Sequence, residues 1–151
     1  MSVRQNILDA ARLDLLTINA TGSFVNDLKT AFKSFHYVGD LAVSEFDSCY
    51  IHAGLAVKIR LPDYVRVWEL PLVGLVYFKC DTDTTNQGLL ETKAETLIAD
   101  LELVIWANIK AVGLSDDSAR MESIELLSVA PYITEYEDRG VIYFELKVTY
   151  Y

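Results

Sequence analysis

The chain has 151 residues, 52% of them hydrophobic, with only 3 prolines and 7 glycines. A chain of this length and composition can fill the core of one domain, which excludes a disordered or low-complexity protein. Its formal net charge is −9, and the acidic excess falls entirely after residue 60, so the basic face that nucleic-acid binding needs is not expected.

The N-terminal third predicts one helix and short strands. Residues 3–18 repeat apolar side chains at helical spacing, which favours an amphipathic helix with Ile7, Ala11, Leu15 and Ile18 on its buried stripe. Part of 24–35 is expected to form a strand, and residues 36–48 a loop or a loosely paired hairpin arm. Residues 49–53 read as a short strand that ends at Gly54.

The stretch from Tyr64 to Cys80 is rich in β-branched and aromatic residues and predicts strand almost throughout. Pro71 cannot donate to a ladder, so we expect an edge, a bulge or a break there. Residues 75–78 are apolar on both faces. A sheet with one wet face would not require this, so a helix or another subunit is expected to cover the second face.

The C-terminal half predicts a helix and a hairpin. A polar turn at 81–88 precedes a helix over roughly 89–111, with Gly113 just past its end. Two strands follow at about 121–135 and 141–150, and Gly140 closes their turn with a positive φ available to it. The order indicates a single α+β domain, in which two helices pack on a mainly antiparallel sheet.

Candidate chemical groups do not combine into a known site. Cys49 and His52 are three apart, so on a strand they point to opposite faces. His36, His52 and the two cysteines lack metal-ligand spacing, and the thiols of Cys49 and Cys80 are expected to be free. Asp81 and Asp83 are interpreted as a solvated turn, and the acids at 135–138 as a hairpin tip. No catalytic, metal or cofactor site is predicted.

The chain also lacks targeting signals. No apolar run approaches the roughly 18 residues of a membrane span, and the first residues lack a signal-peptide stretch, so synthesis in the cytoplasm is expected. Aromatic residues are abundant, with nine Tyr, six Phe and two Trp. Several fall outside the predicted core stripes, which favours burial in a contact with another subunit.

The order of elements resembles a known family. Five segments together are similar to the tail terminator, or tail completion, proteins of long-tailed bacteriophages. These segments are the N-terminal helix, the segment from Ser44 to Gly54, the apolar strand from Leu72 to Lys79, the helix from Leu89 to Lys110 and the closing hairpin that ends at Phe144–Tyr150. Neck and minor tail proteins share the same small α+β plan.

This resemblance implies a virion structural protein of the phage tail, made in the host cytoplasm, and not an enzyme. It would form a homo-oligomeric ring, with a hexamer favoured, that stops polymerisation of the tail-tube protein and joins the tail to the head–tail connector or neck protein. DNA would pass through the ring without specific binding. The alternatives are another neck or tail component, an adaptor of a non-viral contractile apparatus, or a small-ligand-binding α+β domain.

Residues 35–46, called the arm below, are apolar but aperiodic. Side chains of this kind left in water would form an exposed patch typical of a partner site. We therefore expect the arm to lie on an adjacent protomer, with Phe35, Tyr37 and Phe46 as anchors. The full predicted interface also includes Val38, Leu41, and, on the outward face of the last strand, Val141 and Tyr143.

Overall fold

The computed structural model describes residues 3–19, 23–60, 66–80, 87–108, 121–132 and 138–150. The turn residues Asp81 and Asp83, the hairpin-tip acids Glu135 and Glu137, and Gly113 lie outside these ranges. The described helices and strands are α1 (Val3–Leu16), β1 (Thr30–Phe32), the 3₁₀ turns η1 (Val38–Asp40) and η2 (Val43–Glu45), β2 (Ser48–Ala53), β3 (Val57–Arg60), β4 (Arg66–Lys79), α2 (Gln87–Asn108), β5 (Met121–Tyr132) and β6 (Arg139–Tyr150).

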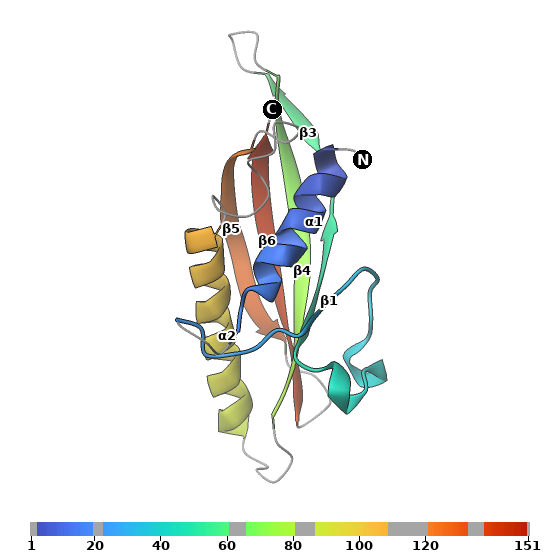
Figure 1. The fold of residues 1–151 in the computed structure, drawn as a ribbon, viewed down its shortest axis with the longest axis vertical. Coiled ribbons are helices and arrows are strands. Elements are labelled where there is room, and N and C mark those ends of the chain that lie inside the picture. Colours follow the sequence, from blue (N-terminus) through green and yellow to red (C-terminus); the bar gives the residue numbers. More distant parts are fainter. Residues whose placement is uncertain are drawn as a thin grey trace.

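The strands form one six-stranded sheet in the order β1-β2-β4-β6-β5, with β3 paired to β4 beyond the end of β2 (Figure 1). The β1–β2 pair is parallel, and every other pair is antiparallel. The predicted α+β class with two helices on a mainly antiparallel sheet is confirmed. The short strand β3 was not predicted.

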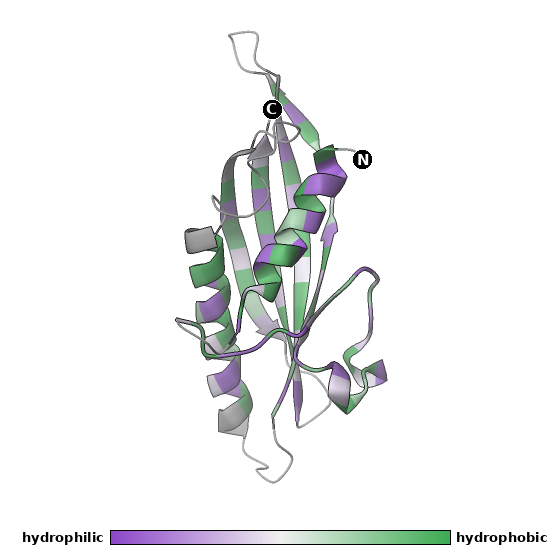
Figure 2. Ribbon diagram, in the orientation of Figure 1, coloured by the Kyte–Doolittle hydropathy of each residue, from purple (hydrophilic) through white to green (hydrophobic). Residues whose placement is uncertain are grey.

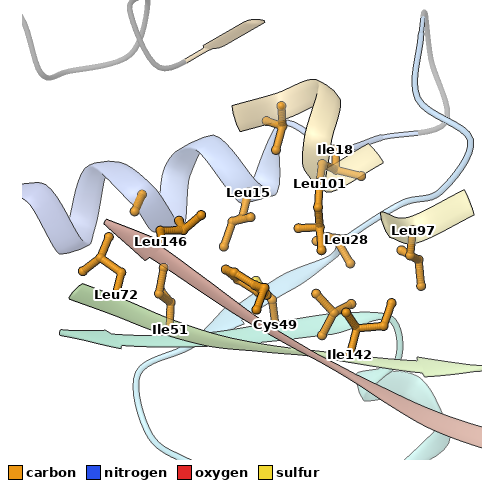
Figure 3. Packing of buried hydrophobic residues seen from close by; sticks show 14 of the residues in the cluster. Leu15, Ile18, Leu28, Cys49, Ile51, Leu72, Leu97, Leu101, Ile142 and Leu146 are labelled. Atoms are coloured by element: carbon orange, nitrogen blue, oxygen red, sulfur yellow. The ribbon is translucent and has the colours of Figure 1, made fainter. Parts of the chain in front are cut away.

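Both helices lie on the same face of the sheet, which we call the helical face (Figure 1). The predicted stripe of α1 and the apolar positions of α2 meet the even-numbered residues of β6, where Ile142, Phe144, Leu146 and Val148 are buried. Burial therefore alternates residue by residue along most of β6. Figure 3 shows how these side chains interdigitate between helices and sheet around Cys49 and Leu101, the close packing expected of a protein core.

The segment between α1 and β1 is held against α2 by one buried acid. Asp100 is 2% exposed, and its carboxylate accepts hydrogen bonds from the backbone N–H groups of Val25 and Asn26. The Asn26 side chain donates to the same carboxylate and to the Thr96 hydroxyl. These bonds satisfy a charge that would otherwise be costly to bury, and they fix the path that leads the chain to β1.

Pro71 does not interrupt β4. The ladder to β6 continues through it, where it faces Lys147. On the other side β4 pairs with β3 as far as Glu69 and with β2 from Leu72 onward. The Pro71 carbonyl accepts from the Gly54 N–H on that side at 2.8 Å. The nitrogen of a strand residue points the same way as its carbonyl, so the missing N–H falls in the gap between β3 and β2.

Two glycines permit close cross-strand packing. Gly74 faces Phe144 and Gly140 faces Phe78 in the β4–β6 ladder. A Cβ built on Gly74 would lie 2.1 Å from Phe144 Cζ, and one built on Gly140 would lie 2.2 Å from Phe78 Cζ. Gly140 was expected in the hairpin turn, where a positive φ would be available to it, but it lies within β6 and its φ is not positive. The space under an aromatic ring is what requires glycine here.

Candidate oligomer interface

The face of the sheet opposite the helices, the open face, is covered at one end by the chain itself. Leu41 and Phe46 of the arm pack on Tyr77 of β4 and form a second buried cluster, with Phe32, Val38 and Val141 at its margin. Residues 75–78 are thus apolar on both sides because Val76 and Phe78 enter the main core while Tyr77 lies under the arm. Neither a helix nor another subunit provides this part of the cover.

Polar contacts fix the arm to its own sheet at three points. The Tyr77 hydroxyl donates to the His36 carbonyl at 2.6 Å and accepts from the His36 backbone N–H at 3.4 Å. Burial raises the pKa of Tyr77 above its usual value, and the bond from the His36 N–H opposes the rise. Arg139 donates to the Val38 carbonyl at 3.3 Å and stacks over the Phe46 ring, 5.3 Å from its centroid.

The third point is Asp47, which follows the arm. Its carboxylate accepts from the Lys79 backbone N–H at 3.1 Å and pairs with Lys93 Nζ of α2 at 2.8 Å. Lys93 also donates to the Lys79 carbonyl. Asp47 therefore joins the end of the arm, the end of β4 and the first half of α2.

These contacts correct the predicted arm. Leu41 is 3% and Phe46 5% exposed, so neither side chain is available to anchor a neighbouring chain. The sequence pattern was misleading because an aperiodic segment can still be packed when single side chains, and not one continuous stripe, meet a sheet. Val38 and Val141 are half-buried against the same cluster.

Phe35 and Tyr37 project away from this cluster. Their side chains are 50% and 69% exposed, and their rings meet edge to face at 4.9 Å between centroids. Phe35 also contacts Tyr50 of β2 at 6.0 Å, and Tyr50 stacks on the exposed ring of His52 at 5.6 Å. The outer part of the arm is thus an aromatic patch that continues onto β2.

Tyr143 carries the apolar surface to the other side of the open face. It is half-exposed, and its ring meets Tyr132 of β5 edge to face at 6.0 Å. Its hydroxyl forms a short hydrogen bond with Glu145, which, with burial, raises the pKa of Tyr143 to about 12. The phenol therefore stays neutral at physiological pH.

Strand register connects these two groups. Tyr50 lies opposite Leu75, and Leu75 lies opposite Tyr143. A row of apolar side chains thus crosses the sheet, and we call it the aromatic band: Tyr37, Phe35, Tyr50, Leu75, Tyr143 and Tyr132. Its two ends are exposed, whereas Tyr50, Leu75 and Tyr143 in the middle are partly buried, the first two against the cluster under the arm. It holds three of the seven predicted interface residues, Phe35, Tyr37 and Tyr143. Of its other members, Tyr50 could have been recognised as outward-facing because it alternates with Cys49 and Ile51 along the strand. No sequence pattern indicated that Tyr132 would join the band.

Groups with potential reactivity lie apart from one another. Cys49 is fully buried on the helical face, and burial raises the pKa of its thiol to about 12 against an opposing effect of Arg12, whereas His52 is exposed on the open face. The described residues contain no group of three or more His, Cys, Asp or Glu able to hold a metal ion. Asp14 of α1 is 7% exposed, and burial raises its pKa to about 7.

No helix in the described part of the chain is both long and apolar enough to cross a membrane. Comparison of the chain with models of protein families and with curated protein sequences gives no match.

Proposed function

We propose that this chain is the ring-forming tail terminator of a long-tailed bacteriophage, a virion subunit that closes the end of the tail tube. The observation that carries the proposal is the aromatic band on the open face of the sheet. The resemblance in the order of elements is the reason for proposing a phage tail as the assembly. The band is the physical reason for proposing that the chain associates with copies of itself.

The band has the composition of an association surface. Tyr and Phe bury large areas with few rotatable bonds, and such residues dominate the binding energy of protein interfaces. The two exposed anchors, Phe35 and Tyr37, are held on a segment that is fixed at His36 and Val38. A prearranged aromatic patch loses little side-chain entropy when a partner covers it.

In this role the chain would bind copies of itself in a closed ring, with a hexamer favoured, and contact the tail-tube protein on one side and the head–tail connector or neck protein on the other. The net charge of −9 supports a ring through which DNA slides without adhering, because like charges repel phosphate. No enzymatic activity, cofactor or membrane contact belongs to this proposal. Another neck or minor tail component would use the same band.

A small-ligand-binding domain remains the second candidate, and one cleft favours it. The cleft has a volume of about 390 Å³ and lies between the end of β4, α2 and the segment before β1. Lys29, Lys79 and Lys93 line it together with Asp27 and Asp47, so a polar ligand that carries both charged and neutral groups would fit its lining. A ligand-dependent rise in melting temperature of a stable monomer would favour this candidate over ring assembly.

Negative-stain images of the purified protein test the proposal. Wild-type protein is expected to show closed rings with a central opening, because a heterologous contact closes by rotation. The double variant Phe35→Ser/Tyr37→Ser should remain folded, with unchanged circular dichroism, and show no rings. The matched control is Leu13→Ser/Val25→Ser, which removes two apolar side chains that lie outside the band and are 57% and 64% exposed. This control variant should still form rings. Rings that persist in the band variant would contradict the role of the band.

A further inference from the structure

The edges of the described sheet differ in how well they are protected against pairing with another strand. β1 has only three residues and is flanked by the exposed lysines Lys29 and Lys33. β5 has register shifts at 121–123 and 126–128 and carries Pro131. Short length, flanking charge, irregular register and proline are features that keep an edge strand from pairing with another chain.

The outer edge of β2 is closed by helix α1. β1 pairs only with residues 48–50 at the start of β2, so the carbonyls beyond them on that side have no strand partner. Arg4 of α1 donates to the Ala53 carbonyl at 2.7 Å, and Arg12 donates to the Ile51 carbonyl at 3.5 Å. Two guanidinium groups therefore occupy the acceptors that a further strand would need.

β3 is the least protected of these edges. It has four residues and pairs with β4 alone among the described strands, in an unbroken register from Val57 to Arg60 (Figure 1). Val57, and Leu55 just before the strand, are 54% and 77% exposed. Figure 2 shows that hydrophobic and hydrophilic positions alternate along β3. Only its short length and the charge of Lys58 oppose the addition of a strand here.

The ladder identifies the backbone groups of β3 that face away from β4. The Pro71 carbonyl points to the side of β4 on which β2 and β3 lie, so Glu69, two residues earlier, points the same way. Its partner Val57 makes the ladder bonds. Lys58, the next residue, therefore directs its N–H and C=O away from β4. No described residue donates to or accepts from either group.

The side chains of β3 define the chemistry that an added strand would need. Lys58 is exposed on the opposite face of the sheet from Val57 and has no ion pair with a described residue. A strand added here places alternate side chains beside Lys58 and beside Val57. Acidic residues fit the first position and apolar residues the second.

The charge of Lys58 also argues against a second copy of β3 as the added strand. Such a pair would place Lys58 of one chain opposite or diagonal to Lys58 of the other on the same face. Like charges in these positions destabilise a strand pair. The local charge therefore favours a different polypeptide, with acidic side chains on this face.

We propose that β3 is a docking edge for an extended segment of another polypeptide, in which apolar residues alternate with acidic ones, and that this segment joins the sheet as a further strand. The backbone of Lys58 supplies hydrogen bonds, and its ammonium group selects the acidic side of the partner. Val57 and Leu55 supply the apolar contact. This inference goes beyond the proposed function, because it concerns a partner other than a neighbouring subunit and a part of the sheet outside the aromatic band.

Two synthetic octapeptides test the docking edge: one alternates valine with glutamate, and the other alternates valine with lysine. Binding of each labelled peptide to the full chain is measured by fluorescence anisotropy at 150 mM salt, where exposed charges more than about 8 Å apart are largely screened. The glutamate peptide should bind more tightly. Non-specific attraction to a chain of net charge −9 would favour the lysine peptide instead, so the expected preference reports the local charge at Lys58.

Two substitutions at one position separate the charge from the hydrogen bonds. Lys58→Glu should weaken binding of the glutamate peptide about fivefold and strengthen binding of the lysine peptide. Lys58→Pro removes the outward N–H, which no ladder bond uses, and should weaken both peptides about tenfold. Lys33→Glu, beside β1, is the matched control and should bind both peptides as wild type does. If circular dichroism shows that Lys58→Pro is unfolded, Lys58→Glu decides the test alone.

Three results would overturn the proposal. The first is that the glutamate peptide does not bind, or binds more weakly than the lysine peptide. The second is that it binds the folded Lys58 variants as tightly as wild type. The third is that no peptide binds while Leu55→Ser/Val57→Ser lowers the mass of the wild-type assembly in light scattering, which would make this edge a contact between copies of the chain.

Discussion

Replacement of Phe46 by alanine distinguishes between two interpretations of the arm: that it packs on its own sheet and covers it, or that it packs on a neighbouring chain. Phe46 is 5% exposed and packs with Leu41 and Tyr77 beneath the Arg139 guanidinium. Removal of a buried phenylalanine side chain costs about 3–5 kcal/mol. Because the arm is a loop that can partly collapse into the space, the low end of the range, about 3 kcal/mol, applies here.

A loss of this size should be plain in both urea and thermal unfolding. For a chain of this length, about 3 kcal/mol corresponds to a fall in melting temperature of about 6–12 °C. Tyr37→Ala is the matched control, since its side chain is 69% exposed and surface substitutions usually change stability by less than about 0.5 kcal/mol in the monomer.

Protein concentration decides where the Phe46 contact lies. An intrachain contact costs the same stability at every concentration, whereas a contact between chains costs stability only where the oligomer is populated. We expect the Phe46→Ala loss to persist at concentrations at which wild type is monomeric. A loss below about 1 kcal/mol there, within the range of an ordinary surface substitution, would refute the description of the arm as a cover for its own sheet.

Three further predictions follow from other parts of the structure. Gly74→Ala should lower the free energy of unfolding by at least about 2 kcal/mol, because its Cβ would lie 2.1 Å from the buried Phe144 ring. Addition of Phe144→Leu to the same chain should recover part of this loss, measured by urea unfolding. If the losses of the two single variants simply add in the double variant, the contact is contradicted. Burial raises the pKa of Asp14 from 3.8 to about 7, so between these pH values the folded state holds a proton that the unfolded state releases. The contribution of Asp14 to the free energy of unfolding is therefore largest below pH 4 and falls by at most about 1.4 kcal/mol per pH unit between pH 4 and 7. Asp14→Asn should remove this slope in denaturation curves taken from pH 4 to 8, and an unchanged slope would show that the carboxyl is not buried unpaired. Duplex DNA should bind weakly and not at all at physiological salt, and a gel shift at submicromolar protein in 150 mM salt would overturn this.

The elements that sequence predicted well are those whose burial follows one simple period. Helix α1 and strand β6 each present one continuous apolar stripe to one core, so the spacing of Ile7, Ala11 and Leu15, or of Ile142, Phe144 and Leu146, is enough to identify them. The four residues of β3 were missed because a strand this short has no measurable period, and it exists through its register with Val67 and Glu69 of β4.

Which of the predicted interface residues would be exposed could be foreseen only in part, for a related reason. Exposure depends on which surface a segment meets, and sequence could not show that Tyr77 would receive Phe46 and Leu41. The residues of the arm that were correctly expected to be exposed, Phe35 and Tyr37, differ from the buried ones by no local pattern. Likewise, the open face acquires its band through cross-strand register, which brings Tyr50, Leu75 and Tyr143 into one row.

The most direct test of the central claim, that this chain closes into a ring through the aromatic band, is the mass of the assembly in solution. Light scattering coupled to size exclusion, over a wide concentration range, should give one dominant species with a mass six times that of a single chain for wild type and a monomer for Phe35→Ser/Tyr37→Ser. Monomeric wild-type protein at every concentration, with and without tail-tube protein, or a band variant that assembles like wild type, would contradict it.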